Sequence, residues 1–172
     1  MKAAGVLAAL AAALVLQTTL AGMSLEGATL VNLVLVAVVY VALAFGAVTG
    51  MLAGTAGGLA QDALAGGIIG VGGMSKTLIG FIVGVLGAQF IVSQTLPRFV
   101  MFVGATFAHE LCFQALHALV EARPFAMHWS ATLTQAAVNG LIGILAFQVV
   151  ELSPGIVQRR RARGTSLSRR RY

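Results

Sequence analysis

The side chains of this chain that could perform chemistry are few and lie in two places. The first is a Gly-rich stretch, residues 46–87, which contains one acid, Asp62, and one base, Lys76. The second is an apolar segment near residue 110 that carries several polar groups: Thr106, His109, Glu110, Cys112, Gln114, His117 and Glu121. A catalytic or metal site would have to draw mainly on these two places.

Neither place contains a known catalytic motif. His109-Glu110 resembles the start of the HExxH motif of intramembrane zinc proteases, but the fifth position is Phe113, so the second metal ligand is missing. Ser75 adjoins Lys76, and neighbouring residues on a helix do not face each other, which argues against a Ser/Lys dyad. No G-x-S-x-G elbow is present either. The sequence therefore predicts neither an enzyme nor a metal site.

The Gly-rich stretch also lacks a nucleotide-binding motif. Its segment GGIIGVGGMSK superficially resembles a phosphate-binding loop, but Met74-Ser75 precede Lys76 where G-x-x-x-x-G-K-[ST] requires Gly. A single cysteine, Cys112, excludes an internal disulfide and a Cys-based zinc site. We expect no cofactor.

Two polar stripes are predicted at membrane depth. The first shares one helical face and is expected to point into the bundle, beside His109: Glu110, Gln114, His117 and Glu121. The second lies on the following segment: Thr132, Gln135 and Asn139. We expect the stripes to meet, either in ordinary interhelical hydrogen bonds or in a polar, proton-linked pocket.

The composition predicts an all-α integral membrane protein. Hydrophobic residues make up 59% of the 172 residues and charged residues 9%, against about 25% in soluble domains. A membrane domain, residues 1–155, is predicted with six spans: 3–21, 30–48, 49–60, 77–96, 99–120 and 131–150. The third would be short and Gly-rich, covering roughly 18 Å of a hydrocarbon core of about 30 Å. Cleavage of a signal peptide after Ala21 is an alternative for the first segment, although its length favours a span.

The charges predict the topology. Lys2, Arg98 and an Arg-rich tail should lie in the cytoplasm, which requires an even number of spans and leaves Lys76 and Arg123 outside. The tail, residues 156–172, is predicted to be disordered and to contact anionic lipid rather than nucleic acid. Its arginines are Arg159, Arg160, Arg161, Arg163, Arg169, Arg170 and Arg171.

Small residues repeat on two predicted helices. Spacings of three or four residues place glycines on one face, where another backbone can approach closely, within the bundle or on a partner. These candidate helix-interface residues are Gly46, Gly50, Gly54, Gly57, Gly58, Gly80, Gly84 and Gly87. The glycines between them predict a loop from Asp62 to Ser75. Asp62, Gly73 and Lys76 are candidate loop residues. The two charged residues, Asp62 and Lys76, are expected either to be interfacial anchors or to pair with each other or with a partner, which would hold the loop in place.

The segment G-x3-G-x2-GGLAQD followed by G-x-GGMSKT and an apolar GF span resembles the rod shape-determining protein MreD family of bacteria. The length and the six predicted spans agree with this resemblance, whereas the Arg-rich tail departs from the short tails expected. The family motif matches at Gly50, Gly54, Gly57, Leu59, Asp62, Gly73 and Gly80.

The resemblance implies a non-enzymatic scaffold of the rod, or elongation, complex in the inner membrane. Such a protein would bind the membrane helix of MreC and, indirectly, RodA with its penicillin-binding protein and MreB, helping to position peptidoglycan synthesis for cell shape. It implies a fold similar to ECF transporter S-components. The alternative function is therefore an S-component-like subunit that binds a small molecule, such as a vitamin, through the polar stripes.

Overall fold

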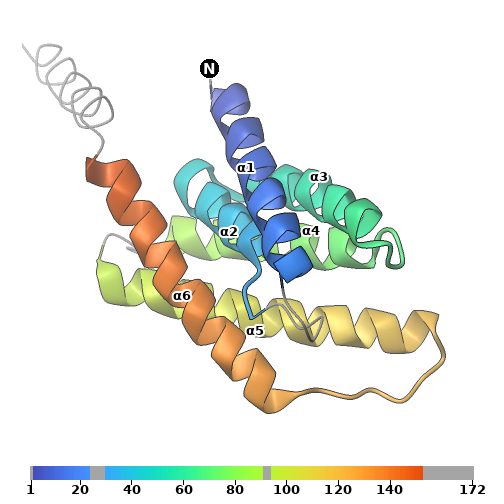
Figure 1. The fold of residues 1–172 in the computed structure, drawn as a ribbon. Helices are drawn as coiled ribbons and strands as arrows, with labels where there is room; N and C mark the ends of the chain where they lie inside the picture. The colour runs from blue at the N-terminus through green and yellow to red at the C-terminus, as the bar shows by residue number, and fades with distance from the viewer. Residues whose placement is uncertain (1, 24–29, 91–93, 153–172) are drawn as a thin grey trace, which may run out of the picture.

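The computed structural model describes residues 2–23, 30–90 and 94–152, which form six α-helices and no strand within these ranges (Figure 1). The all-α prediction with six helices is confirmed. The helices are α1 (Lys2–Met23), α2 (Leu33–Phe45), α3 (Ala47–Ala65), α4 (Val71–Gln89), α5 (Thr95–Val120) and α6 (Trp129–Leu152).

Four of the described helices, α1, α4, α5 and α6, are long and apolar enough to cross a membrane. The short helix is α2 rather than the third helix that the sequence suggested. α2 has 13 residues and α3 has 19, so their lengths are about 20 and 28 Å. Gly46, at φ +93°, ends α2 and lets α3 start at the next residue. Gly46 is therefore a helix break and not the first member of a glycine face.

The loop predicted from Asp62 to Ser75 is also much shorter in the structure. Only residues 66–70 separate α3 from α4. Gly66 ends α3 in the left-handed conformation at φ +68°, and Gly70 precedes α4 at φ +108°. Asp62 thus belongs to the last turns of α3, while Ser75 and Lys76 belong to the first turns of α4. Glycine lowers helical propensity, but packing between the two helices overrides it here.

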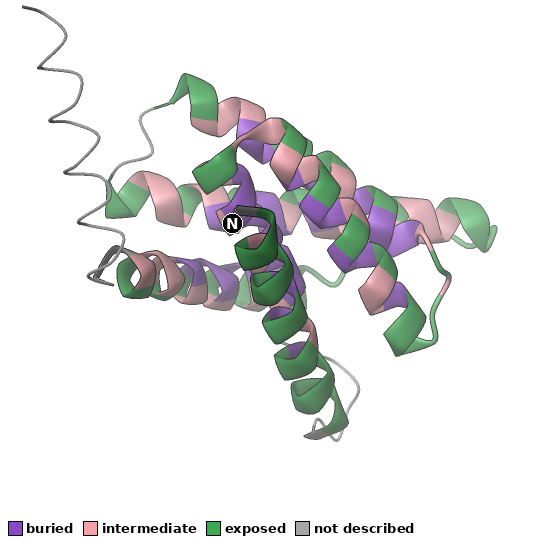
Figure 2. Cartoon of the chain, turned by 90° about the horizontal axis from the view of Figure 1, so that it is seen from above, coloured by how far each residue is buried: buried purple, intermediate pink, exposed green. Residues whose placement is uncertain are grey.

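The bundle is organised around α2, which contacts all five other helices. α3 pairs most extensively with α4, and α5 pairs with α6, which crosses it obliquely (Figure 1). α2 is apolar on all sides, as expected of a helix surrounded by others. Most of α1 is exposed (Figure 2).

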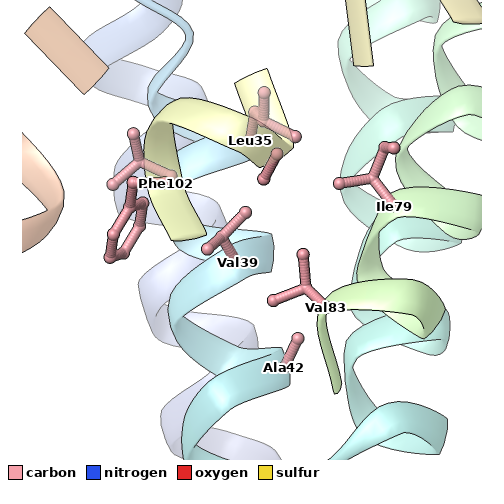
Figure 3. Packing of buried hydrophobic residues seen from close by; sticks show 8 residues of the cluster. Leu35, Val39, Ala42, Ile79, Val83 and Phe102 are labelled. Atoms are coloured by element: carbon pink, nitrogen blue, oxygen red, sulfur yellow. The ribbon is translucent and has the colours of Figure 1, made fainter. Parts of the chain in front are cut away.

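The main apolar core lies between α2, α4 and α5. Leu35 and Val39 of α2 face Ile79 and Val83 of α4, with Phe102 of α5 beside them (Figure 3). All five side chains are almost completely buried. This core positions the first turns of α4 against the middle of α5, where the buried charged groups lie.

Candidate functional site: buried polar groups at the α3–α4–α5 junction

Asp62 closes the turn between α3 and α4. Its Oδ2 atom accepts hydrogen bonds from the amides of Gly70, at 2.9 Å, and Gly73, at 3.1 Å. The first amides of a helix have no intrahelical acceptor, and the positive end of the helix dipole favours a carboxylate there. Asp62 is buried, so it supports the turn from inside the protein. Asp62 thus holds the turn through backbone amides, a third role beside the interfacial anchoring and the charge pairing expected from the sequence.

Two glycines make room for this arrangement. Gly70 supplies the positive φ that precedes α4. A Cβ atom on Gly72 would overlap Oδ1 of Asp62, so only glycine leaves space for the carboxylate. The spacing of Asp62 and the GVGG segment therefore has a direct physical explanation.

Lys76 lies one turn further along α4 and is 2% exposed, so it is not the outward-facing loop charge assumed in the charge count. Its Nζ atom lies 3.2 Å from Nε2 of His109 on α5. Asp62 and Glu110 act on the ammonium group as nearby negative charges. A charged group at membrane depth is costly and is usually paired or functional.

The predicted glycine faces meet each other inside the protein. A Cβ atom on Gly50 would lie 2.6 Å from the Gly80 carbonyl oxygen, and one on Gly58 would lie 2.6 Å from Cα of Gly73. One on Gly54 would overlap the backbone of Lys76. These glycines let α3 and α4 approach backbone to backbone, as small residues do in membrane helix pairs.

The remaining candidate glycines contact other helices. A Cβ atom on Gly84 would overlap Ala47 at the start of α3, and one on Gly87 would lie 2.8 Å from Leu43 of α2. Gly57 faces Leu10 of α1 and Val34 of α2. The candidate helix-interface residues that lie inside helices therefore occupy contacts within the bundle.

A second buried network joins four helices. The Asn139 side chain on α6 accepts from the Asn32 amide at 3.0 Å and donates to Oγ1 of Thr106 on α5 at 3.2 Å. On the other side of the α2 N-terminus, Gln17 of α1 donates to the Val31 carbonyl and accepts from the Leu33 amide. These contacts tie α1, α2, α5 and α6 together at one level.

The inward face of α5 differs from the predicted stripe. The buried positions are Phe102, Ala105, Thr106 and His109. Glu110, Gln114 and His117 are only partly buried and Glu121 is exposed, so this stripe is not the most buried face of α5. Glu110 accepts a hydrogen bond from Gln114, and Glu121 contacts His117 and Arg123. On α6, Asn139 and Thr132 are buried and Gln135 is half-buried.

Two members of the buried network were missed as site residues. Asn32 directly precedes an apolar run, and its side chain caps α2 by accepting from the Leu35 amide; that position is a recognised N-cap signal. Gln17, a lone polar residue in an apolar segment, offered a weaker signal. The arginines of the tail lie outside the described residues.

The geometry does not assemble a metal centre. Among the residues that the structure describes, no group of three His, Cys, Asp or Glu side chains could hold an ion. Two outward-facing grooves, of about 620 and 810 Å³, lie along α3–α4 and between α1 and α2–α3. Neither is lined by α5 or α6, so neither opens onto the predicted polar stripes.

The fold and the buried groups define an all-helical membrane protein whose polar side chains mainly hold its own helices together. The chain belongs to the MreD family, because the family model described as rod shape-determining protein MreD matches residues 4–152. A role in the determination of rod shape follows from that membership. Searches of curated proteins and of solved structures found no match.

Proposed function

We propose that this protein is a non-enzymatic scaffold of the bacterial rod complex, which binds the membrane helix of MreC and helps to position peptidoglycan synthesis. The observation that carries the proposal is the family match over residues 4–152, which includes all six helices almost completely. The structure adds that the interhelical glycines are used internally. A partner helix would therefore meet the outer faces of the bundle.

The proposed location is the inner membrane, with both termini in the cytoplasm. The sequence placed two basic residues, Lys76 and Arg123, outside the cell membrane, and burial of Lys76 leaves only Arg123 of these two in an external loop. On the cytoplasmic side this topology has Lys2, Arg98 and the seven arginines of the tail. The difference in loop charge therefore favours this orientation more strongly. A green fluorescent protein fused to the C-terminus should fluoresce, and an alkaline phosphatase fused there should be inactive; the opposite pair of results would contradict this topology.

The main test is a pull-down of the tagged full-length protein from native membranes in mild detergent, followed by mass spectrometry. Recovery of MreC, with RodA and its penicillin-binding protein, is the expected result. Recovery of an energy-coupling ATPase pair and its membrane partner would instead support the S-component-like function. A chain lacking the tag, expressed at the same level, is the control.

Photocrosslinking then locates the partner. A photoreactive amino acid would replace one exposed apolar residue on each of five helices: Leu7, Leu52, Leu78, Leu111 and Leu141. A helix that binds one face should crosslink from one or two neighbouring positions only. Equal crosslinking to MreC from all five positions would indicate random collision in the membrane and would contradict a defined binding face.

A further inference from the structure

The polar stripe of α5 is only partly covered by the rest of the described chain. Three of its side chains, Glu110, Gln114 and His117, are partly buried, and Glu121 is exposed. Their contacts are local: Gln114 donates to Glu110 at 2.7 Å, and Glu121 contacts His117 and Arg123. None of these contacts joins α5 to another helix. The stripe therefore does not hold the bundle together in the way that the Asn139 network does.

The stripe continues the face of α5 on which α6 packs. Val103 and Phe107 of α5 both lie on that face, and the ring of Phe107 is 5.9 Å from that of Trp129, the first residue of α6. Glu110 and Gln114 follow at spacings of seven residues, so they belong to the same face. Because α6 crosses α5 obliquely, the C-terminal turns of α5 extend past the start of α6 (Figure 1).

The charges near this face are unequal in number. In their ionised forms, Asp62 and Glu110 are two negative charges acting on the single positive charge of Lys76. Asp62 is buried and already accepts from two amides, whereas Glu110 is partly exposed. Glu121 has its own counter-charge, because Arg123 lies 2.8 Å away. The excess negative charge is therefore at Glu110, on the face that α6 leaves uncovered.

The depth of Glu110 makes such a carboxylate costly beside lipid. The helix rises about 18 Å from Arg98 to Glu110, so with Arg98 at the cytoplasmic interface Glu110 lies within a hydrocarbon core of about 30 Å. Acyl chains supply neither a hydrogen-bond donor nor a positive charge, and ionisable groups at this depth are usually paired. A carboxylate can accept about four hydrogen bonds, and Gln114 supplies one.

We propose that the polar stripe of α5 is the docking face for the membrane helix of the partner, and that this helix presents a lysine or arginine to Glu110 from an otherwise apolar surface. The inference rests on the proposed function, in which the partner is MreC, and adds the face and the chemistry of the contact. Leu111, which is 45% exposed beside Glu110, supplies apolar surface for the same helix.

The first test repeats the pull-down from native membranes with a full-length variant that combines Glu110→Gln and Gln114→Leu. Each interhelical polar contact contributes a factor of about three, so losing the charge and the neighbouring amide should lower the recovery of MreC about tenfold. The melting temperature should hardly change, because the hydrogen bond between these two side chains lies within α5. Leu119→Gln, at a 79% exposed position on another face of α5, is the matched control and should change neither value. Full recovery of MreC by the double variant would overturn the docking face, whereas no recovery by wild type would contradict the proposed function itself.

The second test leaves Glu110 intact, and so remains decisive if the double variant is unstable. A photoreactive amino acid replaces either Gln114 on the stripe or Leu119 away from it. MreC should be crosslinked from position 114 and not from position 119. A crosslink from position 114 to a second copy of this chain, or to lipid alone, would refute the proposal, as would capture of MreC from position 119 only.

Discussion

Gly54→Ala tests the backbone-to-backbone contact between α3 and α4. The new Cβ atom would lie 2.5 Å from the carbonyl carbon of Lys76 and 2.8 Å from the amide nitrogen of Thr77. Both are backbone atoms of α4 and cannot rotate away. Since non-bonded heavy atoms prefer about 3.5–4.0 Å, α3 and α4 would have to separate locally by roughly 1 Å.

The expected cost is worked from two opposing effects. Overpacking of this kind typically costs about 1–3 kcal/mol, and sometimes more, whereas replacing a helical glycine by alanine returns up to about 1 kcal/mol. A net loss of about 1–2 kcal/mol should lower the melting temperature of a chain of this size by roughly 2–8 °C. The measurement is thermal unfolding of the purified protein in detergent.

Gly104→Ala provides the matched control. Gly104 lies within α5, and a Cβ atom there would have nothing within 4 Å, so this variant should be as stable as wild type or slightly more stable. Equal melting temperatures for the two alanine variants would refute the close α3–α4 contact. If Gly54→Ala kept its stability but lost MreC in the pull-down, the glycine face would belong to a partner interface instead.

Three further substitutions test the buried polar groups. Asp62→Ala leaves two amides of the α3–α4 turn without their acceptor, at a cost of about 1–3 kcal/mol. Hydrogen exchange at these two amides should therefore accelerate about 5- to 150-fold. Asp62→Asn keeps one side-chain oxygen and should accelerate the exchange less. Asn139→Leu removes the link between α2, α5 and α6 and should lower the melting temperature, whereas an unchanged value would show that this network contributes no stability. Gln17→Leu should loosen α1 and increase its cleavage in limited proteolysis, and the control Thr18→Ala, which loses only a bond within α1, should not.

The sequence predicted the helix count and the class of protein, but not the helix boundaries in the Gly-rich stretch. Local propensity suggested a loop at Gly72 and Gly73, whereas close packing of α3 on α4 makes these residues helical. That packing joins residues of α3 to residues of α4, which come together only when the chain folds. Local patterns therefore could not reveal it.

The orientation of α5 was missed for a related reason. Periodicity correctly groups residues on a face, but the choice of the inward face depends on what the other helices offer. Glu110 belonged to the longer polar stripe, yet the buried position is His109, because Lys76 and the α2–α4 core lie on that side. The pairing of Lys76 with His109 was not predicted, since nothing in the sequence indicated which polar groups would meet.

The helices differ in length and in apolarity, and this has a consequence for biogenesis. α2 is short, and α3 is not among the described helices that are long and apolar enough to cross a membrane on their own. Both pack against α4, which is long and apolar enough to cross a membrane. We therefore expect α2 and α3 to settle in the bilayer only after α4 has left the ribosome, so that the order of synthesis, and not each segment alone, determines their insertion.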